Sequence, residues 1–418
     1  MIKKVKSSQL RPGMYIHDLN CGWLEHPFWG SSLKVRDAAT VNKIVNLGIR
    51  EVFIDTEKGI DVAGVPERDR PAEHEHHFDN TDENVQAATV PETEEYDLGF
   101  KEIRRVPLHQ EIFRARKIKD QAMLTVRNVM NEIRGGGNVE KEQVEDTVND
   151  IIVSVMRNPD ALGSLGRLRK SDEYLYAHSL NVCVLMVSFG KYLGFEPMLL
   201  RDSGIGALLH DIGTMHVPEH ILNKRSALSG EEYDLVREHV ESTRRVMESS
   251  RGIPVTAVLT AYQHHERIDG SGYPQGLKGN EISHAAQAMA IVDVYDALST
   301  KRSFRRRMPP TQALQMLYEW SGTKFDRELV QNFIRCIGIY PAGSVVRLES
   351  GLIGIIVRHN VEKLLEPVVR IVFNAKTHMP VTIPYDIDLA ADTGRGAGDR
   401  IAGFELAEEW DIRPERYL

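Results

Sequence analysis

Apolar residues recur at three- and four-residue spacing through the middle of the chain, and this spacing predicts a series of amphipathic helices. The first helix covers residues 109–134 and ends at three consecutive glycines, residues 135–137. The others cover residues 139–156, 174–193, 198–210, 230–250, 254–265, 284–298, 311–318 and 326–337. The middle of the chain is therefore expected to form an all-α domain of about 200 residues.

Shorter runs rich in β-branched and aromatic residues flank the helices and predict strands. Near the N-terminus, residues 14–19 and 51–55 read as strands, and a helix is expected over residues 37–47 between them. After Pro341, β-rich runs lie at residues 344–348, 354–358, 367–373 and 381–384. The predicted fold is multidomain α+β, with a small mixed α/β N-terminal module, an all-α bundle and a small β-rich C-terminal module of barrel or meander form.

Acidic residues dominate the stretch between the first module and the helices. Residues 71–100 contain nine Asp or Glu and no Lys or Arg. With few apolar residues, this segment cannot bury enough surface to offset its ordering entropy, which favours a flexible linker. We expect an N-terminal module over residues 1–65, the linker over 66–107, a helical domain over 108–342, and a β-rich module with its tail over 343–418.

The composition narrows the classes of function. No run of 18 uncharged apolar residues is present, which argues against a helical membrane span, and no apolar run follows the N-terminal lysines, so no secretory signal is expected. Three widely separated cysteines argue against a disulfide framework and suit a cytoplasmic location. The net charge of −8 provides no chain-wide basic field, so a nucleic-acid polymer is not the expected partner.

The 16 histidines are the unusual part of the composition. Within the predicted helices, histidine and aspartate recur at intervals of 25 to 32 residues, as His178, His210, Asp211, His239, His264, His265 and Asp293. Because the stretches around them are apolar, these side chains are expected to point into a bundle core, where facing helices build metal sites. For Asp293 alone, a buried arginine partner explains the sequence as well as a metal does.

Taken together, the seven side chains favour a metal site. Imidazole and carboxylate donors without cysteine suit iron, manganese, nickel or zinc, and of these we expect iron or manganese first. Seven donors are too many for one tetrahedral ion, so we expect two divalent ions, bridged by a carboxylate such as Asp211. Two such ions stabilise the attacking and leaving oxygens of a phosphoryl displacement. The basic run over residues 301–307 follows the predicted helix of Asp293 and is suited to hold phosphate.

Three blocks of this region resemble the HD superfamily of metal-dependent phosphohydrolases, and its HD-GYP subfamily in particular. The first block begins His210-Asp211-Ile212-Gly213 and continues to Lys224. The second is the long run from His264 to Pro274, and the third runs from Asp293 to Ser299. The N-terminal residues, including Pro12-Gly13-Met14, resemble a domain of unknown function that is often found ahead of bacterial HD-GYP domains.

The resemblance implies a phosphodiesterase that linearises the bacterial second messenger cyclic di-GMP to pGpG and continues to GMP. A metal-bridged hydroxide would attack phosphorus, with Asp211 and His210 at the catalytic core. The first ion would be held by His178, His210, Asp211 and Asp293. The second would be held by Asp211, His239, His264 and His265.

The resemblance also implies contacts with substrate and with partners. Arg302 and Arg305 match basic positions that hold the phosphates and guanine in relatives. Tyr273 belongs to the Gly-Tyr-Pro loop, which shapes the substrate pocket and is linked with binding GGDEF-domain proteins. A homodimer is a further expectation, through the helices over residues 109–156.

Three departures from the family pattern bear on activity. Tyr174 stands where some relatives have a glutamate that holds a third metal, so we expect two ions. Thr214 replaces a lysine three residues after the bridging aspartate, and its loss is expected to lower the rate or loosen substrate choice. The usual Lys-Pro-Gly reads Lys224-Arg225-Ser226 here, which we expect to alter only a loop.

Two further functions therefore stay open beside the phosphodiesterase. The domain could bind a cyclic dinucleotide or a GGDEF partner as an adaptor, with weak or no turnover, and Thr214 is the residue that favours this reading. It could also hydrolyse another nucleotide or an alarmone, although the Gly-Tyr-Pro block argues against that substrate class.

Overall fold

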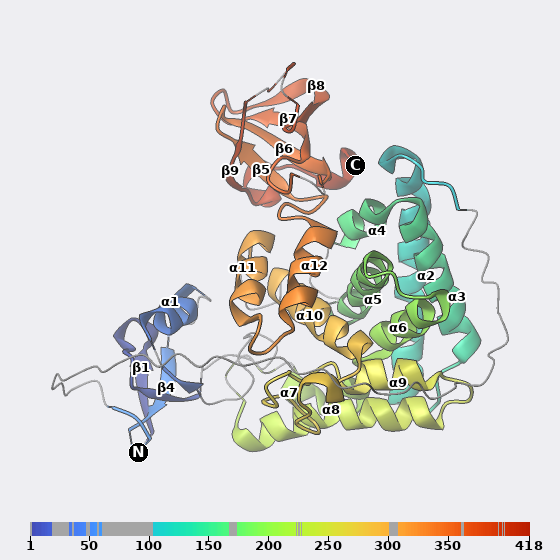
Figure 1. Ribbon diagram of the computed structural model, residues 1–418, viewed down its shortest axis with the longest axis vertical. Helices are drawn as coiled ribbons and strands as arrows, with labels where there is room; N and C mark the ends of the chain where they lie inside the picture. Colours follow the sequence, from blue (N-terminus) through green and yellow to red (C-terminus); the bar gives the residue numbers. More distant parts are fainter. Residues whose placement is uncertain are drawn as a thin grey trace, which may run out of the picture.

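A computed structural model describes residues 2–18, 33–35, 37–46, 51–56, 58–60, 103–166, 174–222, 224, 226, 228–300, 308–360, 363–391, 393–394, 396 and 398–418. Figure 1 shows a small N-terminal sheet module in blue, a large helical domain, and a C-terminal sheet in orange and red. The predicted multidomain α+β architecture is thus confirmed. The predicted acidic linker over residues 66–107 lies outside the described residues, apart from residues 103–107.

The N-terminal module is a four-stranded antiparallel sheet with one helix. Its strands are β1 (Ile2–Lys6), β2 (Tyr15–Asp18), β3 (Leu33–Lys34) and β4 (Glu51–Asp55), in the order β1-β4-β2-β3. Helix α1 (Ala38–Asn46) contributes Ile44 to a core that also contains Ile16 and Ile54. The predicted strands and helix are present, whereas β1 escaped prediction because three of its five residues are lysines.

The helical domain begins after residue 107. Its helices are α2 (Leu108–Arg134), α3 (Lys141–Arg157), α4 (Pro159–Gly166), α5 (Tyr174–Tyr192), α6 (Pro197–Leu209), α7 (Glu219–Leu222), α8 (Gly230–Ser249), α9 (Val255–Tyr262), α10 (His284–Ser299), α11 (Pro310–Trp320) and α12 (Arg327–Ile337). A short 3-10 helix, η4 (Ile212–His216), joins α6 to α7. The short elements α4, α7 and η4 were not predicted, because each is too short to show a helical period.

Side-chain caps set where several of these helices begin. Ser229 accepts a hydrogen bond from the backbone N–H of Glu232 at the start of α8, and the Glu232 side chain accepts one from the backbone N–H of Ser229. Ser283 caps α10 and Asp326 caps α12 in the same sense. These caps fix the starts of the two helices, α8 and α10, that present His239 and Asp293.

Helices α5 and α10 form the centre of the domain. They pack against each other, and α5 also contacts α2, α3 and α6. Most side chains of α10 are buried around its whole circumference, as its nearly continuous apolar sequence requires. On the outer side, α8 packs against α9 and η4. The polar residues on these packed faces are therefore brought into one interior region.

The C-terminal module is a five-stranded antiparallel sheet. Its strands are β5 (Val345–Leu348), β6 (Leu352–Arg358), β7 (Val368–Asn374), β8 (Met379–Asp388) and β9 (Ile401–Phe404), in the order β8-β7-β6-β5-β9. The predicted meander is present, and β9, which was not predicted, returns to pair with β5. Strand β8 contains Pro380 and Pro384, which an edge strand tolerates because its outer N–H groups need no partner.

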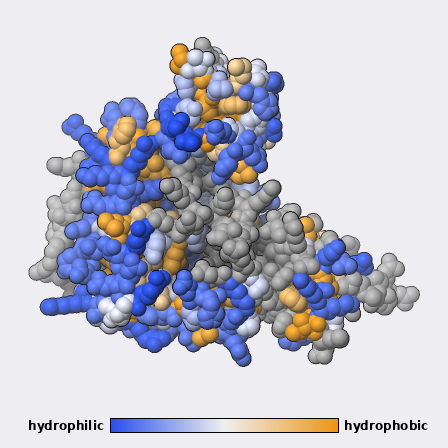
Figure 2. Space-filling model, turned by 180° about the vertical axis from the view of Figure 1, so that it is seen from behind, coloured by the Kyte–Doolittle hydropathy of each residue, from blue (hydrophilic) through white to orange (hydrophobic). Residues whose placement is uncertain are grey.

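The C-terminal sheet is joined to the helical domain through its core. Ile353, Ile355 and Val372 belong to the same buried apolar cluster as the helices. The other face of the sheet, with Ile356 and Ile371, closes a separate small core. The face seen in Figure 2 is largely hydrophilic over the helices, with small apolar patches. Among the described helices, none has the length and apolar character that a membrane crossing requires.

Candidate metal centre

The seven histidine and aspartate side chains picked out in the sequence converge in the interior of the helical domain. His178 lies in the first turns of α5, His210 ends α6 with Asp211 directly after it, His239 is on α8, and Asp293 is on α10. All seven are buried. The prediction that α9 extends to residue 265 was wrong: α9 ends at Tyr262, so His264 and His265 lie in the turn that follows. Their adjacency lets both rings face one point.

Two groups of donors can be distinguished by distance. In the first group, His178 Nε2 lies 3.1 Å from Asp293 Oδ1 and 3.8 Å from Asp211 Oδ2. His210 Nε2 lies 3.3 Å from Asp211 Oδ2 and 3.8 Å from Asp293 Oδ1. Two imidazole nitrogens and two carboxylate oxygens thus surround one small volume.

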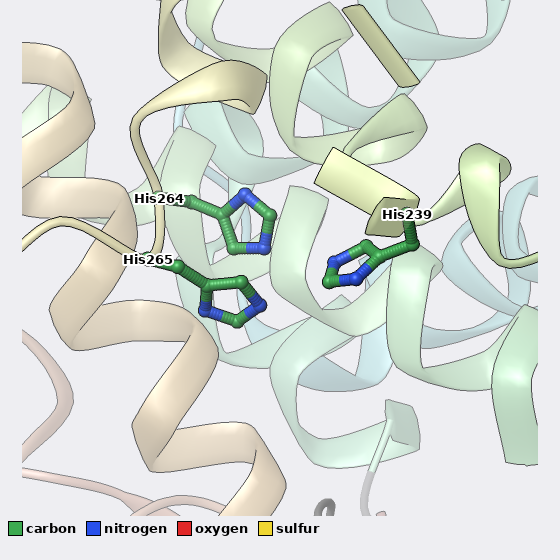
Figure 3. Close-up of side chains that lie close together, drawn as sticks. All are labelled: His239, His264 and His265. Carbon is green, nitrogen blue, oxygen red and sulfur yellow. The ribbon is translucent and has the colours of Figure 1, made fainter. Parts of the chain in front are cut away.

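His239, His264 and His265 form the second group (Figure 3). Figure 3 shows their rings directed toward a common space, with His239 coming from α8 and the other two from the turn. One ligand atom from each lies within 4.8 Å of the others. Asp211 Oδ1 lies 3.3 Å from His239 Nε2, while its Oδ2 faces the first group. The carboxylate of Asp211 therefore stands between the two groups with one oxygen toward each.

Backbone hydrogen bonds select the tautomers of three of these histidines. Nδ1 of His210 donates to the carbonyl of Ala207, and Nδ1 of His239 donates to that of Val236. Nδ1 of His264 donates to the carbonyl of Ala261 at 2.5 Å. With the proton held on Nδ1, the lone pair of each ring is on Nε2, which faces the centre.

His178 is oriented by a carboxylate instead of a carbonyl. Its Nδ1 lies 2.8 Å from Asp296 Oδ2, and Asp296 Oδ1 accepts hydrogen bonds from Asn181 Nδ2 and Thr300 Oγ1. A histidine whose outer nitrogen donates to a carboxylate is a recurring arrangement at metal sites. Sequence reasoning assigned Asp296 no role. The signal was available, because Asp296 follows Asp293 by one helical turn on the same buried helix.

The electrostatics of the centre favour a cation. Burial alone would raise the pKa of Asp211, but the imidazoles of His210 and His239 outweigh it and hold that pKa well below its ordinary value. Asp293 likewise has its pKa lowered to about 2 by His178 and the neighbouring imidazoles, against the effect of burial. Burial, assisted by the adjacent imidazoles, lowers the pKa of His264 to about 3. The centre therefore offers ionised carboxylates and a neutral imidazole, the protonation states that metal ligands require.

The donor set fits divalent metal ions. His264 Nε2 is buried and accepts no hydrogen bond from the residues that the structure describes. A buried nitrogen lone pair left in this way is costly unless something coordinates it. Each of the two groups contains four nitrogen or oxygen donors when the Asp211 carboxylate is counted in both. The residues present thus match the chemistry of a site for divalent metal ions.

The loop that carries Tyr273 closes over the second group. The Tyr273 ring packs against His265, with 4.6 Å between ring centroids, and Arg237 of α8 lies 4.3 Å from the centre of the same ring. The buried carboxylate of Glu266 accepts hydrogen bonds from the backbone N–H groups of Gln275, Gly276 and Leu277. Glu266 thereby fastens the loop to the turn that bears the histidines. Neither Glu266 nor Arg237 was singled out in the sequence, because their contacts depend on loop geometry.

The remaining predicted positions divide into three cases. Tyr174 stacks on the ring of His178, with 5.7 Å between centroids, so an aromatic ring occupies the place considered for a third-metal glutamate. Thr214 is buried and donates its hydroxyl proton to the carbonyl of Asp211 at 2.6 Å. Arg302 and Arg305 lie outside the described residues.

Comparison with known proteins agrees with this fold and centre. The HD domain family matches residues 160–329, and a domain of unknown function, DUF3391, matches residues 2–144. Fold and site thus define an HD-domain phosphohydrolase, a metal-dependent class.

Similarity to one curated relative extends over almost the whole chain. The cyclic di-GMP phosphodiesterase PA4108 of Pseudomonas aeruginosa is 37% identical over 99% of this chain and 94% of its own length. The 3'3'-cGAMP-specific phosphodiesterase 1 of Vibrio cholerae is 32% identical over 39% of this chain and 38% of its own. The cyclic di-GMP phosphodiesterase of Thermotoga maritima is 30% identical over 39% of this chain and 45% of its own. The chain therefore belongs to the HD-GYP family, here with a DUF3391 domain at the N-terminal side.

Among solved structures, Bd1817, an HDG"Y"P protein from Bdellovibrio bacteriovorus, aligns with a TM-score of 0.46 and 17% identity. The alignment covers 80% of this chain and 98% of that protein.

Proposed function

We propose that this protein is a metal-dependent phosphodiesterase that hydrolyses cyclic di-GMP to pGpG and onward to GMP. The observation that carries the proposal is the similarity to a cyclic di-GMP phosphodiesterase over nearly the full length of both chains. A centre of seven buried donors, arranged on both sides of Asp211, provides the chemistry that such a reaction needs.

Each residue of the centre has a defined task in this proposal. His178, His210, Asp211 and Asp293 hold one divalent ion, and Asp211, His239, His264 and His265 hold the other. Bound ions of this kind supply Lewis-acid stabilisation of the phosphoryl oxygens and lower the pKa of water. The protein keeps the histidines in the tautomer that leaves Nε2 for the ions, through the carbonyls of Ala207, Val236 and Ala261 and the carboxylate of Asp296.

Tyr273 is the proposed contact between the loop and the substrate. Burial, followed by the neighbouring Tyr233, raises the pKa of Tyr273 well above its ordinary value. The phenol therefore keeps its proton at neutral pH and can donate a hydrogen bond to a phosphate or guanine oxygen. Arg302 and Arg305 are proposed to hold the phosphates and guanine, on the strength of their family resemblance. The exposed Pro274 beside Tyr273 lies on the surface that we propose for a GGDEF-domain partner.

Iron and manganese are the proposed metals, with nickel and zinc as alternatives. All seven donors are nitrogen or carboxylate oxygen, and the described free cysteines, Cys183 and Cys336, are not among the residues of the centre. Two ions are proposed, and not three, because the aromatic ring of Tyr174 stacks where an additional carboxylate would be required.

A direct assay tests the proposal. Purified protein with manganese or ferrous iron should convert cyclic di-GMP to pGpG or GMP, as followed by chromatography, with 3'3'-cGAMP and an alarmone as comparison substrates. Asp211→Ala should abolish turnover, since it removes the residue that both donor groups share. Asp150→Ala, an exposed aspartate on α3, is the matched control and should retain wild-type activity.

The outcomes separate the candidate functions. Full activity in Asp211→Ala contradicts the two-ion centre. Tight binding of cyclic di-GMP with no product under iron, manganese or nickel favours an adaptor role. The observation that supports this alternative is that residue 214 is a threonine and carries no positive charge. Preferred hydrolysis of the alarmone assigns another substrate class.

A further inference from the structure

A cavity lies at the surface of the helical domain, apart from the metal centre. It has a volume of about 350 Å³ and is formed where residues 103–107, the start of α4, the last turns of α5 and α12, and the end of β6 come together. This volume is within the range of small-molecule pockets. The residues of α5 that line it end at Tyr192, while His178 is near the other end of the helix. The lining residues of α5 run from Val184 to Tyr192, 6 to 14 residues after His178, which is about 9–21 Å along the helix at 1.5 Å per residue.

Five basic side chains contribute to the lining of this cavity. They are Arg105, Lys191, Arg335, Arg358 and His359, against the single carboxylate of Asp160. Two of them, Lys191 and Arg335, stand in the last turns of α5 and α12, where a cation is favourable because of the helix dipole. The other three come from non-helical segments and have no such explanation. The helix dipole therefore does not explain why basic residues from four segments of the chain line one cavity.

Protein carboxylates neutralise only part of this charge. Asp160 Oδ1 lies 3.1 Å from His359 Nδ1, and Arg358 Nη2 lies 3.7 Å from Asp388 Oδ2 at an exposed position. Lys191 Nζ donates to the carbonyl of Val155 at 3.0 Å, which satisfies a hydrogen bond but adds no negative charge. No carboxylate in the described part of the chain forms an ion pair with Arg105 or Arg335.

Two of the basic groups, Lys191 and Arg105, also lie close enough to repel each other. Burial, and after it the positive charge of Arg105, lowers the pKa of Lys191. Like charges gathered around a cavity are unfavourable unless an anion sits among them. Apolar side chains, including Leu185, Ile337 and Pro159, line the rest of the cavity and can contact a base or another ring.

From this charge, volume and lining, we infer that the cavity is a binding site for an organic phosphate of about mononucleotide size, separate from the metal centre. Arg105 and Arg335 supply the charges that the phosphate pairs with, since guanidinium groups bind phosphate through two parallel hydrogen bonds. The apolar wall accepts the organic part. Because α5 carries His178 and also lines the cavity, a ligand here contacts the same helix as the metal centre.

Calorimetry on the metal-loaded, full-length protein tests this inference with three probes: GMP, inorganic phosphate and uncharged guanosine. GMP and phosphate should bind at this site and guanosine should not. The variant Arg105→Gln/Arg335→Gln should weaken that binding event by about tenfold to a hundredfold, because it removes two charge-assisted contacts. Both arginines are exposed, so the variant is expected to fold.

The matched control is Arg104→Gln/Arg400→Gln, which removes the same charge from two exposed arginines outside the cavity. It should bind GMP as the wild type does. GMP held only at the metal centre would bind equally to the wild type and to both variants, and that result overturns the inference. Equal binding of guanosine and GMP also overturns it, since the phosphate would then contribute nothing. The readout is ligand binding and does not depend on cyclic di-GMP hydrolysis.

Discussion

Asp296 offers the sharpest test of how the metal centre is built, because it contacts a proposed ligand but belongs to neither donor group. Its Oδ2 lies 2.8 Å from Nδ1 of His178, and its Oδ1 accepts hydrogen bonds from Asn181 and Thr300 at 3.1 and 3.3 Å. Asp296→Ala removes the acceptor and leaves the buried Nδ1–H of His178 without its carboxylate. Asp296→Asn keeps a carbonyl oxygen near that position but removes the charge.

The expected magnitude follows from this contact. A hydrogen bond to a charged group contributes about 1.5–3 kcal/mol. Loss of a carboxylate that orients a metal-binding histidine typically reduces metal affinity by about 10- to 100-fold, or about 1.4–2.7 kcal/mol. The two estimates agree. We therefore expect about 100-fold weaker metal binding in Asp296→Ala and about 10-fold in Asp296→Asn, since the amide retains part of the hydrogen bond.

Metal titration followed by elemental analysis measures this effect directly, and activity at saturating metal measures what remains after the ions are restored. Asp150→Ala on the exposed face of α3 serves as the control for loss of a carboxylate. Melting curves in the presence of a chelator report whether Asp296→Ala simply unfolds. If Asp296→Ala folds and binds metal with wild-type affinity, then His178 either is not a ligand or does not need Asp296 to orient it, and the reasoning is refuted.

Two further predictions concern the surroundings of the metal centre, and a third concerns the Asp160–His359 pair at the separate cavity. A Cβ atom at Gly213 would lie 2.1 Å from the carbonyl oxygen of His239. Gly213→Ala should therefore displace α8 and lower kcat by about 100-fold, and an unchanged kcat would contradict this expectation. Glu266→Ala removes the carboxylate that accepts hydrogen bonds from three backbone N–H groups, and each lost hydrogen bond costs about 1–3 kcal/mol. Hydrogen exchange over residues 275–277 should therefore accelerate in this variant. Unchanged protection of these amides would contradict the role given to Glu266. Burial tends to lower the pKa of His359, but the hydrogen bond to Asp160 outweighs it and raises that pKa. The pair therefore stabilises the fold fully below about pH 6.5, and this stabilisation is lost as the pH rises through the raised pKa. Asp160→Asn should therefore lower Tm at pH 6 and not at pH 9, and a pH-independent difference would count against the assignment.

The convergence of the seven side chains of the candidate metal centre was predictable from sequence because each polar residue interrupts or ends an apolar stretch. Asp293 is the clearest case, since almost every neighbour on α10 is apolar and buried, and a carboxylate there needs a partner. His210 follows the apolar end of α6 for the same reason. The helical pattern also located most helices to within a few residues. These features depend on local sequence, which is what a hydrophobic period reports.

Other features depended on contacts that no local pattern reveals. The predicted helix over residues 254–265 continued too far, because nothing in its sequence signals an end before Gln263. Its early end is what allows the rings of His264 and His265 to approach within 3.8 Å between centroids. The role of Asp296 required the packing of α5 against α10, and that of Glu266 required a loop that folds back on its own turn. The strand β1, with three lysines, was stabilised by pairing with β4 and not by its own composition.

Thr214 shows why a departure from a family pattern is difficult to interpret from sequence alone. At this position the relatives suggested a lysine, and its absence suggested a missing positive charge. In the structure the Thr214 hydroxyl donates a hydrogen bond to the carbonyl of Asp211, so this residue stabilises the turn that presents the Asp211 carboxylate. A cation is nevertheless present beside the same centre: the half-exposed Arg237 lies over Tyr273, whose ring packs on His265. Arg237 thus places a guanidinium against the loop that covers the second donor group, and this contact depends on the packing of the loop against α8.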